Sequence, residues 1–260
     1  MNLAAAILQL KNAGVEDPER EVHYLLQYCQ AQQIDFTSVL ARRCAREPFA
    51  YITGVQPFWT LDIQVNSNVL IPRPETEHLG EAVLKYLREQ KMSTPKILDL
   101  CTGSGCIPAA LASEIPNAQF TVSDLSSEAL QVARKNLNFA VDRTEFFQGD
   151  LFAALPEPKL FDVITANPPY IAAADFLQLS AELKHEPELA LLANEEGLAC
   201  LKKIIQDAPQ FLAPDGIVVL EYGFGQTQAL LAWAKQHHYQ SIQVNKDLAG
   251  IERVLVLARK

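Results

Sequence analysis

The stretch Ile97-Leu98-Asp99-Leu100-Cys101-Thr102-Gly103-Ser104-Gly105 decides the fold, because a short apolar run leads directly into a loop with two glycines. The run predicts a buried strand, and the glycines let the backbone approach a ligand closely. Similar runs alternate with helical segments along the chain, which is typical of an α/β protein with a mainly parallel sheet covered by helices. Strands are expected at residues 97–100, 120–122, 145–147, 161–164, 216–220 and 253–257.

Acidic residues follow two of these strands, at the sheet edge where α/β proteins bind ligands. Asp124 ends the second strand, the position from which a carboxylate holds a ribose diol, and Asp150 follows the third strand, where a helix cap is the alternative role. A dinucleotide fits less well, since the third glycine of G-x-G-x-x-G falls at Pro108. The pattern favours a cofactor with one nucleoside and a short charged tail, such as S-adenosylmethionine, with Asp99 toward the tail.

The segment Asn167-Pro168-Pro169-Tyr170 follows the strand at 161–164. Two prolines make the backbone rigid and remove two N–H donors, so carbonyl oxygens are presented without competing donors. A planar NH₂ group can then donate one hydrogen to the Asn167 side chain and one to a carbonyl near Pro168, with the Tyr170 ring against its face. This arrangement predicts an amide or amine nucleophile.

The first part of the chain has a different character. Asp17-Pro18 reads as a helix start, and Val22, Leu25 and Cys29 recur at helical spacing. We expect a small helical domain at residues 1–55 that recognises the substrate. A β-hairpin linker is expected at 56–75, with its polar turn at 66–68 and its second strand at 69–71, before a second domain at 76–260.

Composition excludes several function classes. The chain has 260 residues, 49% hydrophobic content and a net charge of −9, so it supports large cores but offers no broad basic surface for nucleic acid. No run is long and apolar enough for a membrane helix, and the N-terminus lacks a basic signal region. Five scattered cysteines without a C-x-x-C pair indicate a reducing compartment and no metal site. We expect a cytoplasmic monomer.

These motifs, in this order, resemble class I S-adenosylmethionine-dependent methyltransferases that modify planar amino groups. Further segments are similar to the PrmC/HemK family of release factor glutamine methyltransferases, and the likeness runs from about Arg46 to Val256. Those segments are Arg46-Glu-Pro-Phe-Ala-Tyr-Ile-Thr-Gly54, Phe58-Trp59, Leu70-Ile-Pro-Arg-Pro-Glu-Thr-Glu77, Glu186-Pro187 and Ala190-Leu191.

The resemblance implies a Rossmann-like methyltransferase sheet and a specific reaction. The family methylates the side-chain amide nitrogen of the glutamine in the Gly-Gly-Gln motif of class I peptide release factors, with S-adenosylmethionine as cofactor. The implied catalytic residues are Asn167, Pro168, Pro169 and Tyr170. The implied cofactor residues are Asp99, Cys101, Thr102, Gly103, Ser104, Gly105, Asp124, Leu125, Asp150, Leu151 and Asn167.

Two departures from the family pattern lie in the cofactor region. Cys101 stands where the family usually has the first glycine of its loop, and Leu151 stands where it often has Trp. Three other functions stay open: a glutamine methyltransferase of a ribosomal protein, an adenine-N6 nucleic-acid methyltransferase, and a noncatalytic S-adenosylmethionine-binding scaffold. The acidic composition disfavours nucleic acid, and the segment at 73–77 favours the release-factor branch.

Overall fold

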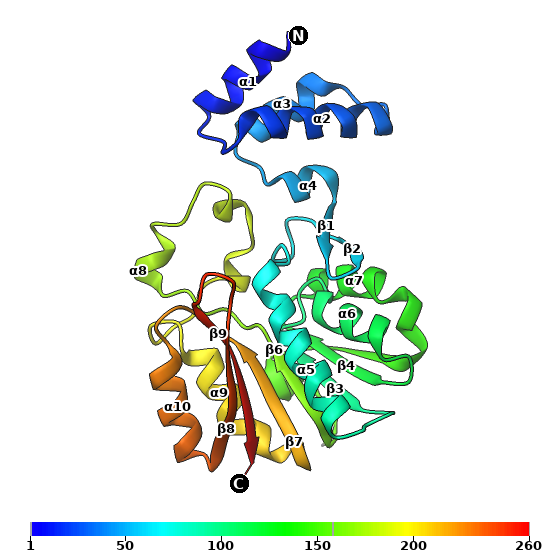
Figure 1. Cartoon of the computed structure of the whole chain (residues 1–260), viewed down its shortest axis with the longest axis vertical. Coiled ribbons are helices and arrows are strands. Elements are labelled where there is room, and N and C mark those ends of the chain that lie inside the picture. The colour runs from blue at the N-terminus through cyan, green and yellow to red at the C-terminus, as the bar shows by residue number, and fades with distance from the viewer. Residues whose placement is uncertain (1, 158, 260) are drawn as a thin grey trace.

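The computed structural model describes residues 2–157 and 159–259, and Figure 1 shows its arrangement. Helices form the N-terminal part, as predicted, and they pack around a small core of their own that includes Leu10, Val22 and Leu25. Asp17 caps the second helix, because its side chain accepts a hydrogen bond from the Arg20 N–H. The four helices are α1 (Leu3–Asn12), α2 (Pro18–Gln32), α3 (Phe36–Cys44) and α4 (Phe49–Thr53).

A β-hairpin follows these helices, but its turn differs from the predicted one. Strands β1 (Val55–Phe58) and β2 (Leu61–Gln64) pair antiparallel around Trp59, which has a left-handed φ of 59°. A turn forms at 66–69, where the Val69 N–H donates to the Asn66 carbonyl at 3.2 Å, but it lies beyond the hairpin, and the predicted strand at 69–71 is wrong. Val69 and Ile71 are buried in the main core without a ladder partner, so their β-branched character reflects packing rather than strand pairing.

The described residues contain a seven-stranded sheet in the order β5-β4-β3-β6-β7-β9-β8. The first five strands in this order are parallel, as predicted, and β9 and β8 join antiparallel to the end. All six predicted strands are present, whereas β8 was not foreseen. The strands are β3 (Lys96–Leu100), β4 (Gln119–Asp124), β5 (Thr144–Gln148), β6 (Phe161–Ala166), β7 (Leu212–Glu221), β8 (Tyr239–Lys246) and β9 (Glu252–Arg259).

Helices cover both faces of this sheet, because successive side chains of a strand point to opposite sides. On β3, Ile97 joins the core under α5, α6 and α7, whereas Leu98 joins the core under α9 and α10. The longer helices are α5 (Glu77–Glu89), α6 (Cys106–Glu114), α7 (Ser127–Asn136), α9 (Ala199–Asp207) and α10 (Thr227–Gln236).

Short helical turns occupy the connections between the longer elements. They are η1 (Pro74–Thr76), η2 (Asn138–Arg143), η3 (Leu151–Ala154), α8 (Ala173–Phe176), η4 (Leu183–His185), η5 (Glu188–Ala190) and η6 (Ala208–Gln210).

Across residues 2–157 and 159–259, none of the helices combines the length and apolar character of a membrane span.

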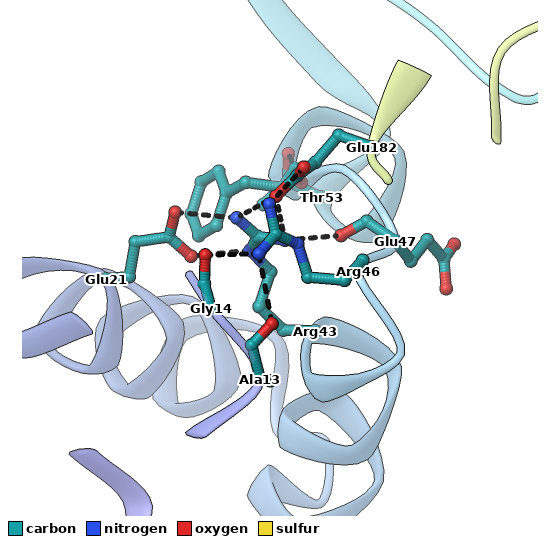
Figure 2. A network of polar contacts seen from close by, with 9 residues as sticks. Ala13, Gly14, Glu21, Arg43, Arg46, Glu47, Thr53 and Glu182 are labelled. Carbon is teal, nitrogen blue, oxygen red and sulfur yellow. Dashed lines mark hydrogen bonds and ion pairs between the residues drawn. The ribbon is translucent and has the colours of Figure 1, made fainter. Parts of the chain in front are cut away.

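A network of ion pairs joins the N-terminal helices to the long connection between β6 and α9 (Figure 2). The Arg43 guanidinium donates to Glu21 at 2.6 Å and to Glu182 at 3.2 Å, and Arg46 also pairs with Glu182. Arg46 donates further to the Ala13 carbonyl at 3.0 Å. The helical region is therefore fixed to the connection that begins with Asn167 and includes Tyr170. The division into domains at 1–55, 56–75 and 76–260 stays a prediction.

Candidate active site

A cavity of about 240 Å³ lies at the carboxyl ends of β3, β4 and β6, where the sequence predicted the ligand. Polar and apolar residues from four predicted loops line it together. The predicted residues in the lining are Cys101, Thr102, Gly103, Ser104, Asp124, Leu125, Asp150, Leu151, Asn167 and Pro169. The predicted residues outside the lining are Asp99, Gly105, Pro168 and Tyr170.

The glycine loop between β3 and α6 takes a left-handed conformation at three positions. Cys101 has a φ of 54°, Gly103 of 54° and Gly105 of 75°. A left-handed φ costs a residue with a Cβ about 1–2 kcal/mol, which explains why the family usually has glycine where this chain has Cys101. Gly105 serves packing, because an added Cβ would lie 3.1 Å from the Cβ of Ala133 on α7.

Asp124 holds this loop in place. Its Oδ2 accepts the Gly103 N–H at 2.8 Å, and its Oδ1 accepts the Ser126 N–H at 2.9 Å. Burial raises the pKa of Asp124, and these backbone hydrogen bonds offset part of that effect. Each carboxylate oxygen keeps a further lone pair, so Asp124 can still accept hydroxyl groups from a ligand in the cavity.

Asp99 lies behind the loop, at the end of β3. It is fully buried, its Oδ1 accepts the Thr165 hydroxyl at 2.6 Å, and its Oδ2 has no hydrogen-bond partner in the described part of the chain. Burial raises the pKa of Asp99 to about 7. A cationic group above the loop would stabilise the ionised form of this carboxyl.

The far end of the cavity is formed after β5. Asp150 precedes η3, and Leu151 has a left-handed φ of 49° while it contributes an apolar surface to the lining. Cys101 and Cys200 also line the cavity. Burial raises the pKa of both thiols, so they remain protonated and act as small apolar groups.

Asn167 brings an amide group to the end of β6. Its Nδ2 donates to the Thr76 hydroxyl at 3.2 Å. Its Oδ1 is buried and, within residues 2–157 and 159–259, has no hydrogen-bond partner. A buried acceptor without a partner is costly in a folded protein, and this one belongs to a residue of the cavity lining. Asn167 therefore brings an acceptor without a partner in the described chain to the wall of the cavity.

Tyr170 points away from the cavity lining. Its hydroxyl donates to Glu221 Oε1 at 3.1 Å, and its carbonyl accepts the Gln226 side chain at 3.1 Å. Burial raises the pKa of Tyr170, which excludes its titration near neutral pH. These two bonds hold Tyr170 to β7 and to the start of α10, and the contact of its ring with the acceptor group stays a prediction.

Two segments that are far from the predicted loops in sequence form the remaining wall of the cavity. The sequence motifs did not predict these segments as part of the site. Residues 67–72 and 187–190 contribute to the lining, and the buried Glu186 joins them. Its carboxylate accepts the Ile71 N–H at 3.0 Å and pairs with Arg73. The proximity of these segments is a tertiary feature, and the polar neighbours of Glu186, Lys184 and His185, gave no local signal of a buried acid.

Gly197 keeps the Asn167–Tyr170 segment in position and yields a first prediction. It has a φ of 85°, and an added Cβ would lie 2.1 Å from the Tyr170 carbonyl oxygen. Gly225 is a matched control, because it has a φ of 80° but nothing within 4 Å of an added Cβ. Gly225→Ala is expected to lose about 1–2 kcal/mol of unfolding free energy, and Gly197→Ala about 2 kcal/mol more. Denaturant titration measures both, and equal losses would contradict this steric role.

Comparisons with known proteins agree with this fold. The methyltransferase small domain family matches residues 79–238. Among solved structures, a methyltransferase from Pyrococcus furiosus is similar with a TM-score of 0.56 at 16% identity, covering 86% of this chain and 97% of that one. A ribosomal protein L11 methylase from Lactobacillus delbrueckii subsp. bulgaricus is similar with a TM-score of 0.54 at 18% identity, covering 79% and 90%. These likenesses establish the Rossmann-like methyltransferase fold.

Sequence relatives define the family more narrowly. The chain is 42% identical over 214 residues to the release factor glutamine methyltransferase of Neisseria gonorrhoeae, which covers 82% of this chain and 77% of that protein. It is 37% identical to the protein of the same description from Vibrio cholerae, over 97% of this chain and 93% of that protein. The glycine loop, Asp124 and Asn167 thus lie in a shared methyltransferase fold, and the chain belongs to the release factor glutamine methyltransferase family.

Proposed function

We propose that this enzyme transfers the methyl group of S-adenosylmethionine to the side-chain amide nitrogen, N5, of the glutamine in the Gly-Gly-Gln motif of class I peptide release factors. One observation carries this proposal: Asn167 lines the cavity, and its buried Oδ1 has no hydrogen-bond partner among the described residues. A primary amide donates two hydrogens from one nitrogen, so it matches a site with free acceptors.

The residues of the cavity fit the cofactor. Asp124 retains lone pairs for the two ribose hydroxyls, and Leu125 and Leu151 supply apolar surface for a base. Asp99 supplies negative charge behind the loop for a cationic tail, with its Oδ2 without a partner in the described chain. When bound, S-adenosylmethionine supplies the sulfonium methyl group. The assignment of each cofactor contact is part of the proposal.

Asn167 and the main chain orient the acceptor. In the proposed complex, Asn167 Oδ1 accepts one N–H of the substrate amide and the Pro168 carbonyl accepts the other. An amide nitrogen is a poor nucleophile, since its lone pair is delocalised into its own carbonyl. Two acceptors turn the nitrogen so that its lone pair faces the methyl group, and such positioning is worth on the order of 7–11 kcal/mol in well-aligned reactions. The displaced proton passes to water.

Partner recognition follows the same proposal. The net charge of −9 supports a protein substrate over direct contact with nucleic acid. The helical region at 1–55 is assigned to recognition of the folded release factor, because an exposed loop alone offers few anchors. We assign the enzyme to the cytoplasm, where release factors act, and to a monomeric state.

A methylation assay tests the proposed function. The purified chain is incubated with S-adenosylmethionine and an unmodified class I release factor, and peptide mass spectrometry locates the modification. The expected result is one added methyl group on the glutamine of Gly-Gly-Gln and none on a factor in which that glutamine is alanine. Methylation of DNA or of ribosomal proteins, with the release factor unmodified, would overturn the proposal in favour of those acceptors.

A further inference from the structure

The side chain of Gln226 joins three parts of the backbone beside the segment Asn167–Tyr170. Its Oε1 accepts the Gly223 N–H at 2.8 Å. Its Nε2 donates to the Tyr170 carbonyl at 3.1 Å and to the Glu196 carbonyl at 3.3 Å. One amide group therefore connects the turn that follows β7, the end of the segment Asn167–Tyr170 and the long connection between β6 and α9.

The three backbone partners fix the orientation of this amide. A backbone N–H only donates and a carbonyl only accepts, so the Gly223 N–H requires the Gln226 oxygen and the two carbonyls require its NH₂ group. A tight turn restrains the residue further, because the Gln226 N–H donates to the Gly223 carbonyl at 3.3 Å. Neither a carboxylate nor an apolar side chain can make the same three side-chain hydrogen bonds.

Two glycines leave the space that the Gln226 side chain occupies. An added Cβ at Gly197 would lie 2.6 Å from the Gln226 Nε2. An added Cβ at Gly223 would lie 3.1 Å from the Gln226 Oε1 and 3.2 Å from Cδ2 of the Tyr170 ring. Both glycines therefore serve the close approach of this amide to the backbone.

The segment Asn167–Tyr170 depends on donors from elsewhere in the chain. Pro168 and Pro169 have no N–H group and a fixed φ, so these positions supply no backbone donor and bend little. A stiff stretch transmits a displacement of one end to its other positions. The bond from Gln226 to the Tyr170 carbonyl therefore restrains the direction of the carbonyl groups that precede it in this stretch.

We propose that Gln226 is a positioning residue for the methyl transfer. By holding the Tyr170 carbonyl, it sets the direction of the Pro168 carbonyl, which in the proposed complex accepts one N–H of the substrate amide. Gln226 is not part of the cavity lining, so its effect falls on the rate of the chemical step and not on the affinity for the cofactor. This inference rests on the proposed function.

Gln226→Met tests the inference, because methionine has a similar length but cannot make the three hydrogen bonds. In single-turnover assays with S-adenosylmethionine and an unmodified class I release factor, we expect the chemical rate to fall about tenfold. The Kd for S-adenosylmethionine should stay within about twofold of the wild-type value. Gln228→Met is the matched control and should keep the full rate, because Gln228 is exposed and lies in the first turn of α10.

Gln226→Glu gives a readout that a loss of stability would not change. Its ionised carboxylate repels the Tyr170 and Glu196 carbonyls, whereas its protonated form can donate to one of them and still accept the Gly223 N–H. Hydrogen bonding to the neutral form favours protonation, so the variant should regain activity at lower pH. We expect the ratio of its single-turnover rate to the wild-type rate to rise about tenfold from about pH 8.5 to about pH 6, while the ratio for Gln226→Met stays constant.

The outcomes separate the inference from the proposed function. Titration of the acidic residues on the elements that meet here, Glu195, Glu196 and Glu221, cancels in the rate ratio because both enzymes share them. A full chemical rate in a folded Gln226→Met, or a ratio independent of pH in a folded Gln226→Glu, would overturn the inference alone. A wild-type enzyme that leaves the release factor unmodified would instead overturn the proposed function, and the inference with it.

Discussion

Asn167→Ala is expected to lower the turnover of release factor methylation about 100- to 1,000-fold, a loss comparable to that of one preorganised transition-state contact in other enzymes. The physical reason is that the variant removes the buried Oδ1 acceptor, which has no other partner in the described chain. The amide would then be held by one carbonyl alone, and its nitrogen would sample orientations whose lone pair does not face the methyl group.

The measurement separates binding from chemistry. Single-turnover rates give the chemical step, and calorimetry gives the affinity for S-adenosylmethionine, which we expect to change by less than about threefold because most of the lining remains intact. Asn117→Ala is the control, since Asn117 is exposed and precedes β4, at the opposite edge of the sheet. A full chemical rate in a folded Asn167→Ala would remove Asn167 from the proposed mechanism.

Arg43→Ala is expected to cost about 3–5 kcal/mol of unfolding free energy. Arg43 is 5% exposed, and its guanidinium pairs with Glu21 of α2 and Glu182 of the connection after β6 (Figure 2). Truncation removes the cation from Glu21 and leaves Glu182 with Arg46 alone. Glu182 belongs to the same connection as the cavity residues at 187–190. In Arg43→Ala, the N-terminal helices should therefore restrain this wall of the cavity less.

The neighbouring Arg42 supplies a matched control for this prediction. Arg42 pairs with Glu47 at the surface, where its side chain is 46% exposed. Solvent screens such a pair, so Arg42→Ala should cost less than about 1 kcal/mol. Denaturant unfolding followed by circular dichroism measures both variants. Equal, small losses would show that the network in Figure 2 contributes little to stability.

Much of the site was predictable because it follows the order of the strands. Residues that follow the ends of parallel strands meet at one edge of the sheet, so Gly103, Asp124, Asp150 and Asn167 could be assigned to one cavity from the sequence alone. Glu221 obeys the same rule, because it directly follows the apolar run at 216–220. The sequence therefore contained a signal for a polar residue at this strand end, but Glu221 was not among the predicted site residues.

Other features depend on contacts that leave no local pattern. The strand β8 escaped prediction, since it sits at the sheet edge and mixes polar with apolar residues. The segment at 69–71 has the composition of a strand but packs into the core without a ladder partner. In both cases the neighbours available in three dimensions, and not the residue types, decided whether a ladder formed.

The sequence alone specified the α/β class, the edge of the sheet where the cavity lies and the loop residues that line one side of that cavity, because these depend on periodicity and on residues adjacent to strand ends. The tertiary structure alone decided how the Asn167 amide is held. Its Nδ2 donates to Thr76, which lies 91 residues earlier in the sequence, while its Oδ1 keeps no partner in the described chain. The partners of a hydrogen bond are a property of such assembled neighbours, since an amide and a hydroxyl can each donate or accept and only their places in the fold decide which atoms meet.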